Sequence, residues 1–376
     1  MVLKKKTLFT THPALDRERK NLLFLNLIKT RRTTSRTEVS RLTDTNVVTV
    51  SNYINSYIRK GLVVESGYDT SSGGRRPELI EINKRWGYVV GIDIGGGSAK
   101  GILAGIDMGV IAEDSISNGA GHDAALLIEK IVQKLSLAAK VDMKEIRKIG
   151  IGVSETAEES FEKIVRAKDA IEAKMGIPIL CANGALSAAF GEISLNLKIS
   201  EAKSILYIYT DAGWGVFKSG NEFYEASEKG RSLGYLKPWG ENITIERVAK
   251  KIVEEGASAK MADIAKGYTG KITAEVAIKA AKEGDEVAMD LVKTVGMNLG
   301  VRVAYLINLF VPEAVVVGGG IEEAGGLFFD SLNASVDKFI SREIKDKVKL
   351  APAVSGKDVC VKGAAALAIR EALIEA

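Results

Sequence analysis

Apolar and polar residues alternate with a helical period over the first sixty positions. Leucines and Ile28 recur between Asp16 and Thr30 so that one face of a helix would be buried, which predicts a first helix over this range. Ser35 stands three residues before Glu38, and a hydroxyl followed at this spacing by a glutamate is typical of a helix N-terminus closed by a capping box. The pattern therefore predicts a short second helix over residues 36–42.

A third helix is predicted from Val47 to Lys60, after a polar turn and before Gly61, which suits the left-handed position that ends many helices. Apolar residues at helical spacing define its buried face: Val47, Val50, Ile54, Tyr57 and Ile58. The residues of the opposite face are polar, with side chains that can form hydrogen bonds: Thr49, Ser51, Asn52, Asn55, Ser56 and Arg59. Such a face near a helix N-terminus suits the reading of base edges in the major groove of DNA.

Two short strands, residues 62–65 and 78–82, enclose a loop that carries Arg75 and Arg76 on a glycine-rich backbone. Three helices and a basic hairpin are the pattern of a winged helix-turn-helix. The two arginines suit a narrow minor groove, where the potential is most negative; an ordinary hairpin tip with solvated charges is the alternative. Four further arginines flank the helices and are expected to hold phosphates: Arg31, Arg32, Arg36 and Arg41.

The distribution of charge also favours a nucleic-acid partner. The formal net charge of the chain is +4, but residues 1–87 carry +9 and the remainder carries −5. We therefore expect residues 1–86 to bind double-stranded DNA, with a helix-turn-helix used only for protein contact as the alternative. The side chains expected to do so are Arg36, Thr49, Ser51, Asn52, Asn55, Arg59, Arg75 and Arg76.

Beyond residue 87 the pattern is that of an α/β body in which buried strands end in glycine turns. Three such strands begin at Tyr88, Ile205 and Ala314, and the first is expected to turn back into a second strand as a hairpin. Helical patterns lie between them, over residues 123–139, 245–255 and 286–310. A glycine turn after a buried strand can bring backbone N–H groups to a phosphate. Three such turns in one chain favour a binding cleft large enough for a nucleotide or a sugar.

Composition narrows the class of protein. The 376 residues are 46% hydrophobic and 27% charged, which excludes a disordered or collagenous chain and predicts several domains. No apolar run approaches the roughly 20 residues of a membrane-spanning helix, and the basic N-terminus does not resemble a secretory signal, so we expect a cytoplasmic protein without a membrane partner. Two cysteines and two histidines, widely separated, exclude the spacings of common metal sites.

Several motifs occur in the order found in the ROK family of repressors, open reading frames and sugar kinases. The helix-turn-helix pattern is followed by SSGGRRP, a Gly-x-Asp-Ile-Gly-Gly strand, MGIPI, VPEAVVVGGGI and KGAAALAI. The chain resembles this family from about Arg17 to Ala372, and the pairing of SSGGRRP with the Asp-Ile-Gly-Gly strand resembles its repressor branch. The resemblance implies a sugar or sugar-derived effector, and homodimers or homotetramers that bind palindromic operators.

The resemblance also implies the fold class and the domains. We expect an α/β protein, with an N-terminal winged helix-turn-helix followed by a two-lobed, actin-like ATPase fold of the sugar-kinase type. The winged helix-turn-helix would occupy residues 1–86. The first lobe would span residues 87–187 and be completed by a C-terminal helix over 358–376, and the second lobe, with an oligomerisation surface, would span 188–357.

The chain departs from the kinase pattern at the catalytic position. Kinases of the family carry an Asn-Asp pair whose aspartate is the general base, whereas here Asn183 is followed by Gly184, which cannot accept a proton. The sugar-binding glutamate and histidine of the family align with Ser232 and Tyr235, and Glu246 matches a later glutamate. The resemblance therefore gives Asn183, Ser232, Tyr235 and Glu246 as the effector-binding candidates.

The resemblance leads us to expect neither zinc nor another cofactor. The histidine replaced by Tyr235 is a zinc ligand in the family, and residues 236–241 stand where the family has its cysteine cluster. The nucleotide-binding positions are vestigial: Asp93, Gly95, Gly96, Thr210, Gly213, Gly318 and Gly319. A carboxylate at Asp211 would face phosphates with like charge, which disfavours ATP binding.

Two functions follow from these observations. The leading prediction is a DNA-binding transcriptional regulator that represses genes of carbohydrate use and senses its effector through a catalytically inactive, sugar-kinase-like body. The alternative is an ATP-dependent sugar kinase, for glucose, mannose or an N-acetylhexosamine, that retains a DNA-binding domain.

Overall fold

The computed structural model describes residues 16–68, 77–95, 98–117, 124–153, 158–195, 202–210, 214–219, 222–225 and 245–375. The chain forms two compact units, one of residues 1–183 with 361–376 and the other of residues 184–360. The expected lobe boundaries at residues 187 and 358 lie a few residues from these. No helix in the described part of the chain combines the length and apolar character needed to cross a membrane.

The first unit begins with the three predicted helices, α1 (Asp16–Arg31), α2 (Arg36–Thr43) and α3 (Val47–Arg59). Ser35 caps α2, since its hydroxyl accepts a hydrogen bond from the Glu38 backbone N–H at 3.2 Å. The Glu38 carboxylate accepts a hydrogen bond from the hydroxyl of Thr34, the residue before the cap, at 2.8 Å. The side chain of Asn46 caps α3, and Gly61 ends it at a φ of +72°.

A three-stranded antiparallel sheet packs against these helices, with strand order β1-β3-β2. The predicted hairpin is confirmed as β2 (Val63–Tyr68) and β3 (Glu78–Ile82). The third strand, β1 (Thr33–Ser35), has only three residues between two helices, too few for an alternating pattern to reveal. The core that joins helices and sheet includes Phe24, Ile28, Val39, Ile54 and Ile80.

One residue of the predicted buried face of α3 lies outside this core. Val50, Ile54 and Tyr57 are buried as expected, but Val47 is 41% exposed. Side chains of a helix tilt toward its N-terminus, so the side chain of the first residue projects beyond the packed turns. The prediction for Val47 was therefore wrong.

Trp86 joins the winged helix-turn-helix to the rest of the first unit. Its carbonyl oxygen accepts hydrogen bonds from Arg147 Nε at 3.1 Å and Nη2 at 2.9 Å. The guanidinium of Arg147 also lies over the indole ring, 5.1 Å from its centroid. The junction between the two parts of the first unit is therefore held by both a polar and a cation–π contact.

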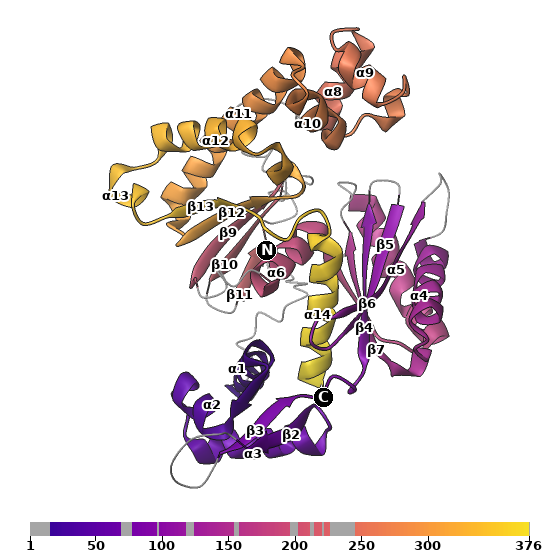
Figure 1. Ribbon diagram of the computed structural model, residues 1–376, viewed down its shortest axis with the longest axis vertical. Coiled ribbons are helices and arrows are strands. Elements are labelled where there is room, and N and C mark those ends of the chain that lie inside the picture. Colours follow the sequence, from indigo (N-terminus) through magenta and orange to yellow (C-terminus); the bar gives the residue numbers. More distant parts are fainter. Residues whose placement is uncertain are drawn as a thin grey trace, which may run out of the picture. The chain divides into compact units, whose positions relative to one another are not determined.

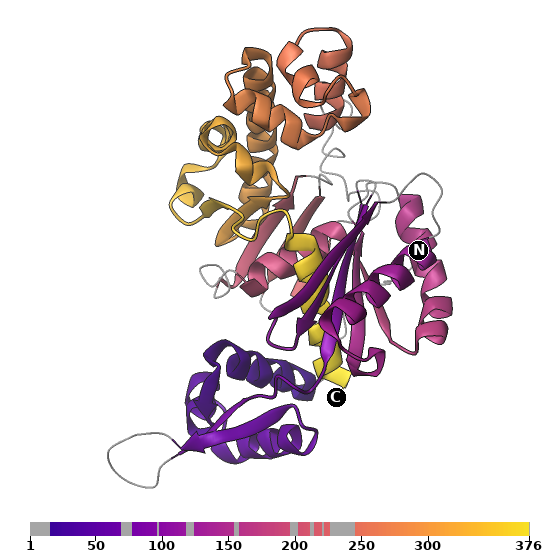
Figure 2. The same ribbon diagram turned by 45° about the vertical axis from the view of Figure 1, so that its right-hand side comes forward.

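The remainder of the first unit is a five-stranded sheet with two helices on one face and the C-terminal helix on the other (Figures 1 and 2). Its order is β6-β5-β4-β7-β8, with β4, β7 and β8 parallel and β5 and β6 antiparallel to their neighbours. The strands are β4 (Tyr88–Gly95), β5 (Ser98–Gly105), β6 (Val110–Ser117), β7 (Ile146–Val153) and β8 (Ile179–Asn183). The expected hairpin is confirmed as β4 and β5.

Alternate residues of β4 face opposite helical layers. Val90 and Ile92 pack in the cluster formed with α4 (Ala124–Ala139) and α5 (Glu158–Met175), whereas Val89 packs in the cluster that includes α14 (Val359–Glu375). A short 3₁₀ helix, η1 (Met143–Glu145), precedes β7. Both faces of β4 are therefore buried, which accounts for its nearly continuous run of apolar residues.

The second unit repeats the strand order of the first, as β11-β10-β9-β12-β13 with the same pattern of parallel and antiparallel pairs. Its strands are β9 (Ser204–Tyr209), β10 (Trp214–Ser219), β11 (Glu222–Glu225), β12 (Ala314–Gly318) and β13 (Lys349–Pro352). Its helices are α6 (Gly184–Leu195), α8 (Ile245–Glu254), α9 (Ala259–Ile264), α10 (Ala274–Lys282), α11 (Glu286–Phe310), α12 (Gly326–Phe339) and α13 (Arg342–Lys345), with 3₁₀ helices η3 (Thr269–Lys271) and η4 (Ile321–Ala324). The helices predicted over 123–139, 245–255 and 286–310 are confirmed as α4, α8 and α11.

Two glycines set the close packing of α11 on α12. A Cβ atom at Gly296 would stand 2.6 Å from the backbone oxygen of Phe328, and one at Gly300 would stand 2.7 Å from Ser335 Cβ. Both positions therefore require glycine for the observed packing. The helix pair lies in the main core of the unit, together with Leu206, Val315 and other apolar side chains of the sheet.

Candidate nucleic-acid interface

Helix α3 turns a polar face away from the core of the winged helix-turn-helix. Asn52, Asn55 and Arg59 are exposed, whereas Val50, Ile54 and Tyr57 are buried. The other polar residues expected on this face, Thr49, Ser51 and Ser56, are half-buried. The division between a buried apolar face and an exposed polar face is thus the predicted one, except at Val47.

A groove of about 510 Å³ lies between α3 and β2. Its lining residues are Asn52, Asn55, Ile58, Arg59 and Glu65. All but Ile58 carry polar groups, so hydrogen-bond donors and acceptors gather in one hollow of the surface. The loop that follows β2 carries Arg75 and Arg76, which lie outside the described residues, so their contact with a minor groove stays a prediction.

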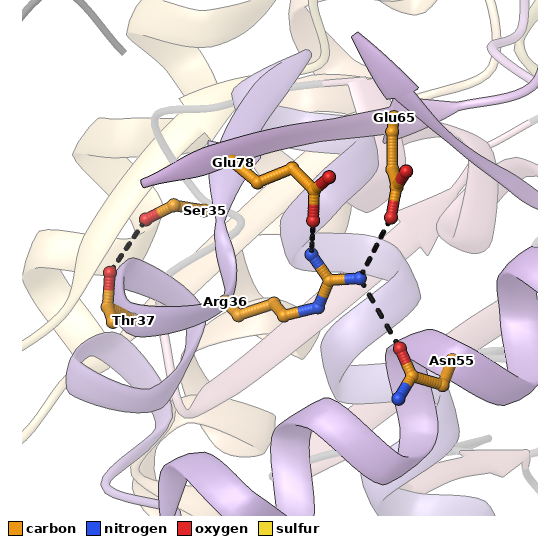
Figure 3. Close-up of polar contacts among 6 residues, drawn as sticks. All are labelled: Ser35, Arg36, Thr37, Asn55, Glu65 and Glu78. Atoms are coloured by element: carbon orange, nitrogen blue, oxygen red, sulfur yellow. Dashed lines mark hydrogen bonds and ion pairs between the residues drawn. The ribbon is translucent and has the colours of Figure 1, made fainter. Parts of the chain in front are cut away.

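Arg36 does not point outward as a phosphate contact would (Figure 3). Its Nη1 donates to Glu78 Oε2 at 2.5 Å, and its Nη2 donates to Glu65 Oε1 at 3.2 Å and to Asn55 Oδ1 at 3.3 Å. The side chain is only 19% exposed. The expectation that Arg36 holds a phosphate is therefore not met in this structure, because two carboxylates of the hairpin compensate its charge.

The other flanking arginines remain at the surface. Arg31 and Arg32 are exposed at the end of α1, and Arg41 is exposed on α2, 4.0 Å from Glu38. An ion pair at that distance between exposed groups contributes little, so the Arg41 guanidinium is available to another anion. Arg59 adds a further exposed cation at the end of α3. Three of the four arginines predicted for phosphate contacts, Arg31, Arg32 and Arg41, therefore lie at the surface, and their contact with phosphates stays a prediction.

Sequence reasoning missed two residues of this surface. Val48, in the first turn of α3, is 64% exposed, and an exposed apolar side chain there suits contact with the methyl group of thymine. Its position two residues after Asn46, the N-cap of α3, was the available signal, because recognition helices contact bases near their N-terminus. Glu65 was also missed, since its contact with Arg36 joins residues that are 29 positions apart.

In the body, two of the four predicted effector candidates lie among the described residues, one in each unit. Asn183 is a buried residue at the end of β8, and Gly184 is the first residue of α6, so the family's base position has no side chain. Glu246 lies in the first turn of α8, where its carboxylate accepts from Lys250 at 2.5 Å. Ser232 and Tyr235 lie outside the described residues, so their role stays a prediction.

Three of the vestigial nucleotide positions meet at one edge of the second sheet. The backbone N–H and the hydroxyl of Thr210 donate to the Gly318 carbonyl oxygen at 2.9 and 2.8 Å, and Gly319 follows at a φ of +100°. A Cβ atom at Gly318 would stand 2.8 Å from the Tyr207 hydroxyl, so the chain passes closely over this buried ring. Asp93 and Gly95 belong to β4 of the first unit, and Gly96 and Gly213 lie outside the described residues.

Buried polar groups surround this glycine turn. Glu192 of α6 accepts hydrogen bonds from the backbone N–H groups of Val354 and Ser355 at 2.9 and 3.0 Å. Burial raises the pKa of Glu322, with the Glu192 carboxylate contributing, although the N–H groups of Glu322 and Gly320 act in the opposite direction. Burial also raises the pKa of the Tyr207 hydroxyl. Glu192 thereby holds the backbone just after β13 (Lys349–Pro352).

Within the described residues, no group of three or more His, Cys, Asp and Glu side chains could hold a metal ion. The segment that replaces the family's cysteine cluster, residues 236–241, lies outside them. The expected absence of zinc therefore stays a prediction.

Comparison with known proteins finds one matching family model and similar proteins in sequence and in structure. Residues 245–371 match the model of the ROK family. A xylose repressor of Caldicellulosiruptor bescii is 29% identical over 365 residues, which cover 88% of this chain and 90% of that protein. A ROK family transcriptional regulator, described as a homologue of the Escherichia coli Mlc protein, superposes with a TM-score of 0.69 at 19% identity, over 96% of this chain and 97% of that one.

A ROK family glucokinase from Streptomyces griseus has a similar fold over a smaller share of the chain. It superposes with a TM-score of 0.60 at 21% identity, over 75% of this chain and 99% of its own length. The predicted fold class is thereby confirmed, as a winged helix-turn-helix followed by the two-lobed, actin-like fold of sugar kinases. Residues 245–371 thus match a ROK family domain, in a chain whose motif order resembles that family and whose fold is shared with a ROK family regulator.

Proposed function

We propose that the protein is a sugar-responsive transcriptional repressor that binds operator DNA through the exposed face of α3. One observation carries the proposal. Helix α3 presents Asn52, Asn55 and Arg59 on a strongly basic N-terminal domain, in a chain that aligns over most of its length with a xylose repressor. Hydrogen-bonding side chains on an exposed helix suit the major groove, where each base pair presents a distinct pattern of donors and acceptors.

In the proposed complex, base reading and phosphate binding fall to different residues. Asn52 and Asn55 would contact base edges, while Arg31, Arg32 and Arg41 would contact phosphates on either side. Phosphate contacts release counterions, so affinity should fall steeply as salt rises. A homodimer or homotetramer would place two copies of α3 on the two halves of a palindromic operator.

The body would act as a sensor that does not phosphorylate its ligand. Gly184 has no side chain to take the proton from a sugar hydroxyl, and loss of a positioned general base typically lowers a rate by about 10²–10⁴. We expect no ATP turnover above background with glucose, mannose or N-acetylglucosamine in a coupled assay. Turnover with one of these sugars would revive the kinase alternative.

The proposed effector is a sugar, with D-xylose the first to test because the aligned relative is a xylose repressor. Binding would release DNA only if the sugar has a higher affinity for the conformation that cannot bind DNA, since equal affinity for both states shifts nothing. A thermal-shift screen over monosaccharides and disaccharides identifies the ligand, because binding to the folded state alone raises the Tm.

Fluorescence anisotropy of the full chain tests the function. The labelled duplex comes from DNA upstream of the protein's own operon, and a scrambled duplex of equal length is the control. We expect tighter binding to the upstream duplex, a loss of affinity with added salt, and release by one sugar of the panel. Equal binding to both duplexes at every salt concentration would contradict the proposal.

A further inference from the structure

The amide of Asn55 is held in one orientation on the surface of α3. Its Oδ1 accepts a hydrogen bond from Arg36 Nη2 at 3.3 Å (Figure 3). A guanidinium has donors but no acceptor, so the reverse orientation of the amide would set its NH₂ group against another donor. The contact therefore favours the orientation in which the oxygen faces Arg36 and the NH₂ group is left for a partner.

Arg36 is itself held in place by two other elements of the domain. The guanidinium of Arg36 donates to Glu78 of β3 at 2.5 Å and to Glu65 of β2 at 3.2 Å. The direction of a guanidinium that makes two such charge-assisted bonds is well defined. The orientation of the Asn55 amide is thus set by the hairpin, through Arg36, as well as by α3.

Asn55 is in addition an exposed residue that lines the groove between α3 and β2. Its NH₂ group is therefore available to a base edge if α3 enters a major groove. An asparagine that is free to use both amide atoms pairs with adenine, accepting from N6 and donating to N7. Here the oxygen faces Arg36 and one of its two lone pairs is already engaged, so the bidentate contact with adenine is disfavoured.

We infer that Arg36 is a positioning residue for base recognition, which makes Asn55 a donor-only reader of keto bases. On the contacted strand, guanine offers O6 and N7 as acceptors and thymine offers O4. Adenine offers N7 alone, beside an exocyclic amine that repels the NH₂ group, and cytosine offers only its amine, so both should be disfavoured. The inference rests on the proposed DNA-binding function and adds the class of base that one side chain selects.

The test is selection of duplexes randomised over the half-site, using the full chain. Comparison of the natural protein with Asn55→Ala identifies the position that Asn55 reads, as the one where preference disappears. We expect the natural protein to favour guanine or thymine there by about tenfold over adenine and cytosine. Selection of adenine at that position, or no position that responds to Asn55→Ala, would overturn the inference.

Two substitutions then separate positioning from a purely structural role. Asn55→Asp keeps the contact with Arg36 at an exposed site but turns an acceptor outward, so preference should move to cytosine or adenine. Arg36→Leu frees the amide, so adenine should become accepted at that position while the base read by Asn52 is unchanged. If Arg36→Leu does not fold, as judged by circular dichroism, Asn55→Asp decides alone, and an unchanged preference in that variant overturns the inference.

Arg41→Gln is the matched control, because Arg41 lies on the same helix as Arg36 and contacts Glu38 instead of Asn55. It should weaken binding to all sequences alike and leave every base preference in place. The two possible failures are distinct. A natural protein without salt-sensitive preference for any sequence would overturn the proposed function, whereas specific binding with adenine at the Asn55 position would overturn only the inference.

Discussion

Gly91 of β4 pairs with Gly150 of β7, and helix α14 passes directly over both residues. A Cβ atom at Gly91 would stand 2.7 Å from the backbone nitrogen of Ala365, and one at Gly150 would overlap the carbonyl oxygen of Ala364. The C-terminal helix therefore reaches the sheet only because two adjacent strands lack side chains at the crossing. The backbone of α14 cannot yield as a flexible side chain would.

We predict that Gly150→Ala lowers the free energy of unfolding by about 1–3 kcal/mol, the usual cost of an overpacked core. Urea denaturation followed by circular dichroism measures the change. Gly270→Ala is the control, because a Cβ atom there has no heavy atom within 4 Å, and it should change stability by less than about 0.5 kcal/mol. Equal effects of the two substitutions would show that α14 does not pack on the sheet as described.

A second prediction concerns the exposed arginine of α2. Arg41→Gln removes one cation from the surface proposed to contact phosphates, so the slope of log affinity against log salt should become shallower by about one. Anisotropy titrations at several salt concentrations measure the slope. A slope identical to that of the natural protein would show that Arg41 does not contact the DNA backbone.

A third prediction follows from the raised pKa of Glu322, which is due mainly to burial. Because the pKa in the folded state is above the ordinary value of 4.5, ionisation opposes folding. This group's contribution to stability is full below pH 4.5 and is lost as the pH rises through the pKa of the folded state. Glu322→Gln removes the charge, so the variant should be more stable than the natural protein at neutral pH, and the difference should vanish on acidification.

Thermal melts between pH 4 and pH 8 measure this difference for Glu322→Gln. Glu343→Gln, at an exposed position of α13, serves as the control for loss of a carboxylate from the surface. A Glu322→Gln variant that is less stable than the natural protein at pH 8 would show that the ionised carboxylate stabilises the turn after β12.

A fourth prediction concerns Cys181 and Cys360, which form no disulfide and are both buried. Burial raises the pKa of Cys181 to about 12, so the reactive thiolate is scarce at pH 8. Cys360 has no exposed surface at all. Neither thiol should react with a disulfide reagent at pH 8 in the folded protein, and both should react in denaturant. Rapid labelling of the native chain would contradict this burial.

The sequence predicted most elements whose signals are local. Helix α3, for example, is marked by a capping asparagine, an apolar face at helical spacing and a terminal glycine, all within sixteen residues of one another. The paired strands of the body are marked by buried runs that end in glycine. In each case the physical cause lies within the segment, so the pattern is sufficient.

Features that depend on distant contacts were not predicted. The direction of Arg36 is set by Glu65 and Glu78, which are 29 and 42 positions away, and α2 alone gives no sign of either contact. Gly91 and Gly150 lie within strands, and their role appears only when α14 returns from the C-terminus to cross them. The candidate site was therefore predicted at α3 itself and missed where the hairpin and α3 meet.

The central claim, that the chain is a sugar-responsive DNA-binding repressor, is tested most directly by one titration. The affinity of the full chain for its own upstream DNA is measured against a scrambled duplex, over a range of salt and with and without each sugar. The account predicts a salt-sensitive preference for the upstream duplex that one sugar abolishes. Binding that ignores both sequence and salt, or no binding at all, would contradict it.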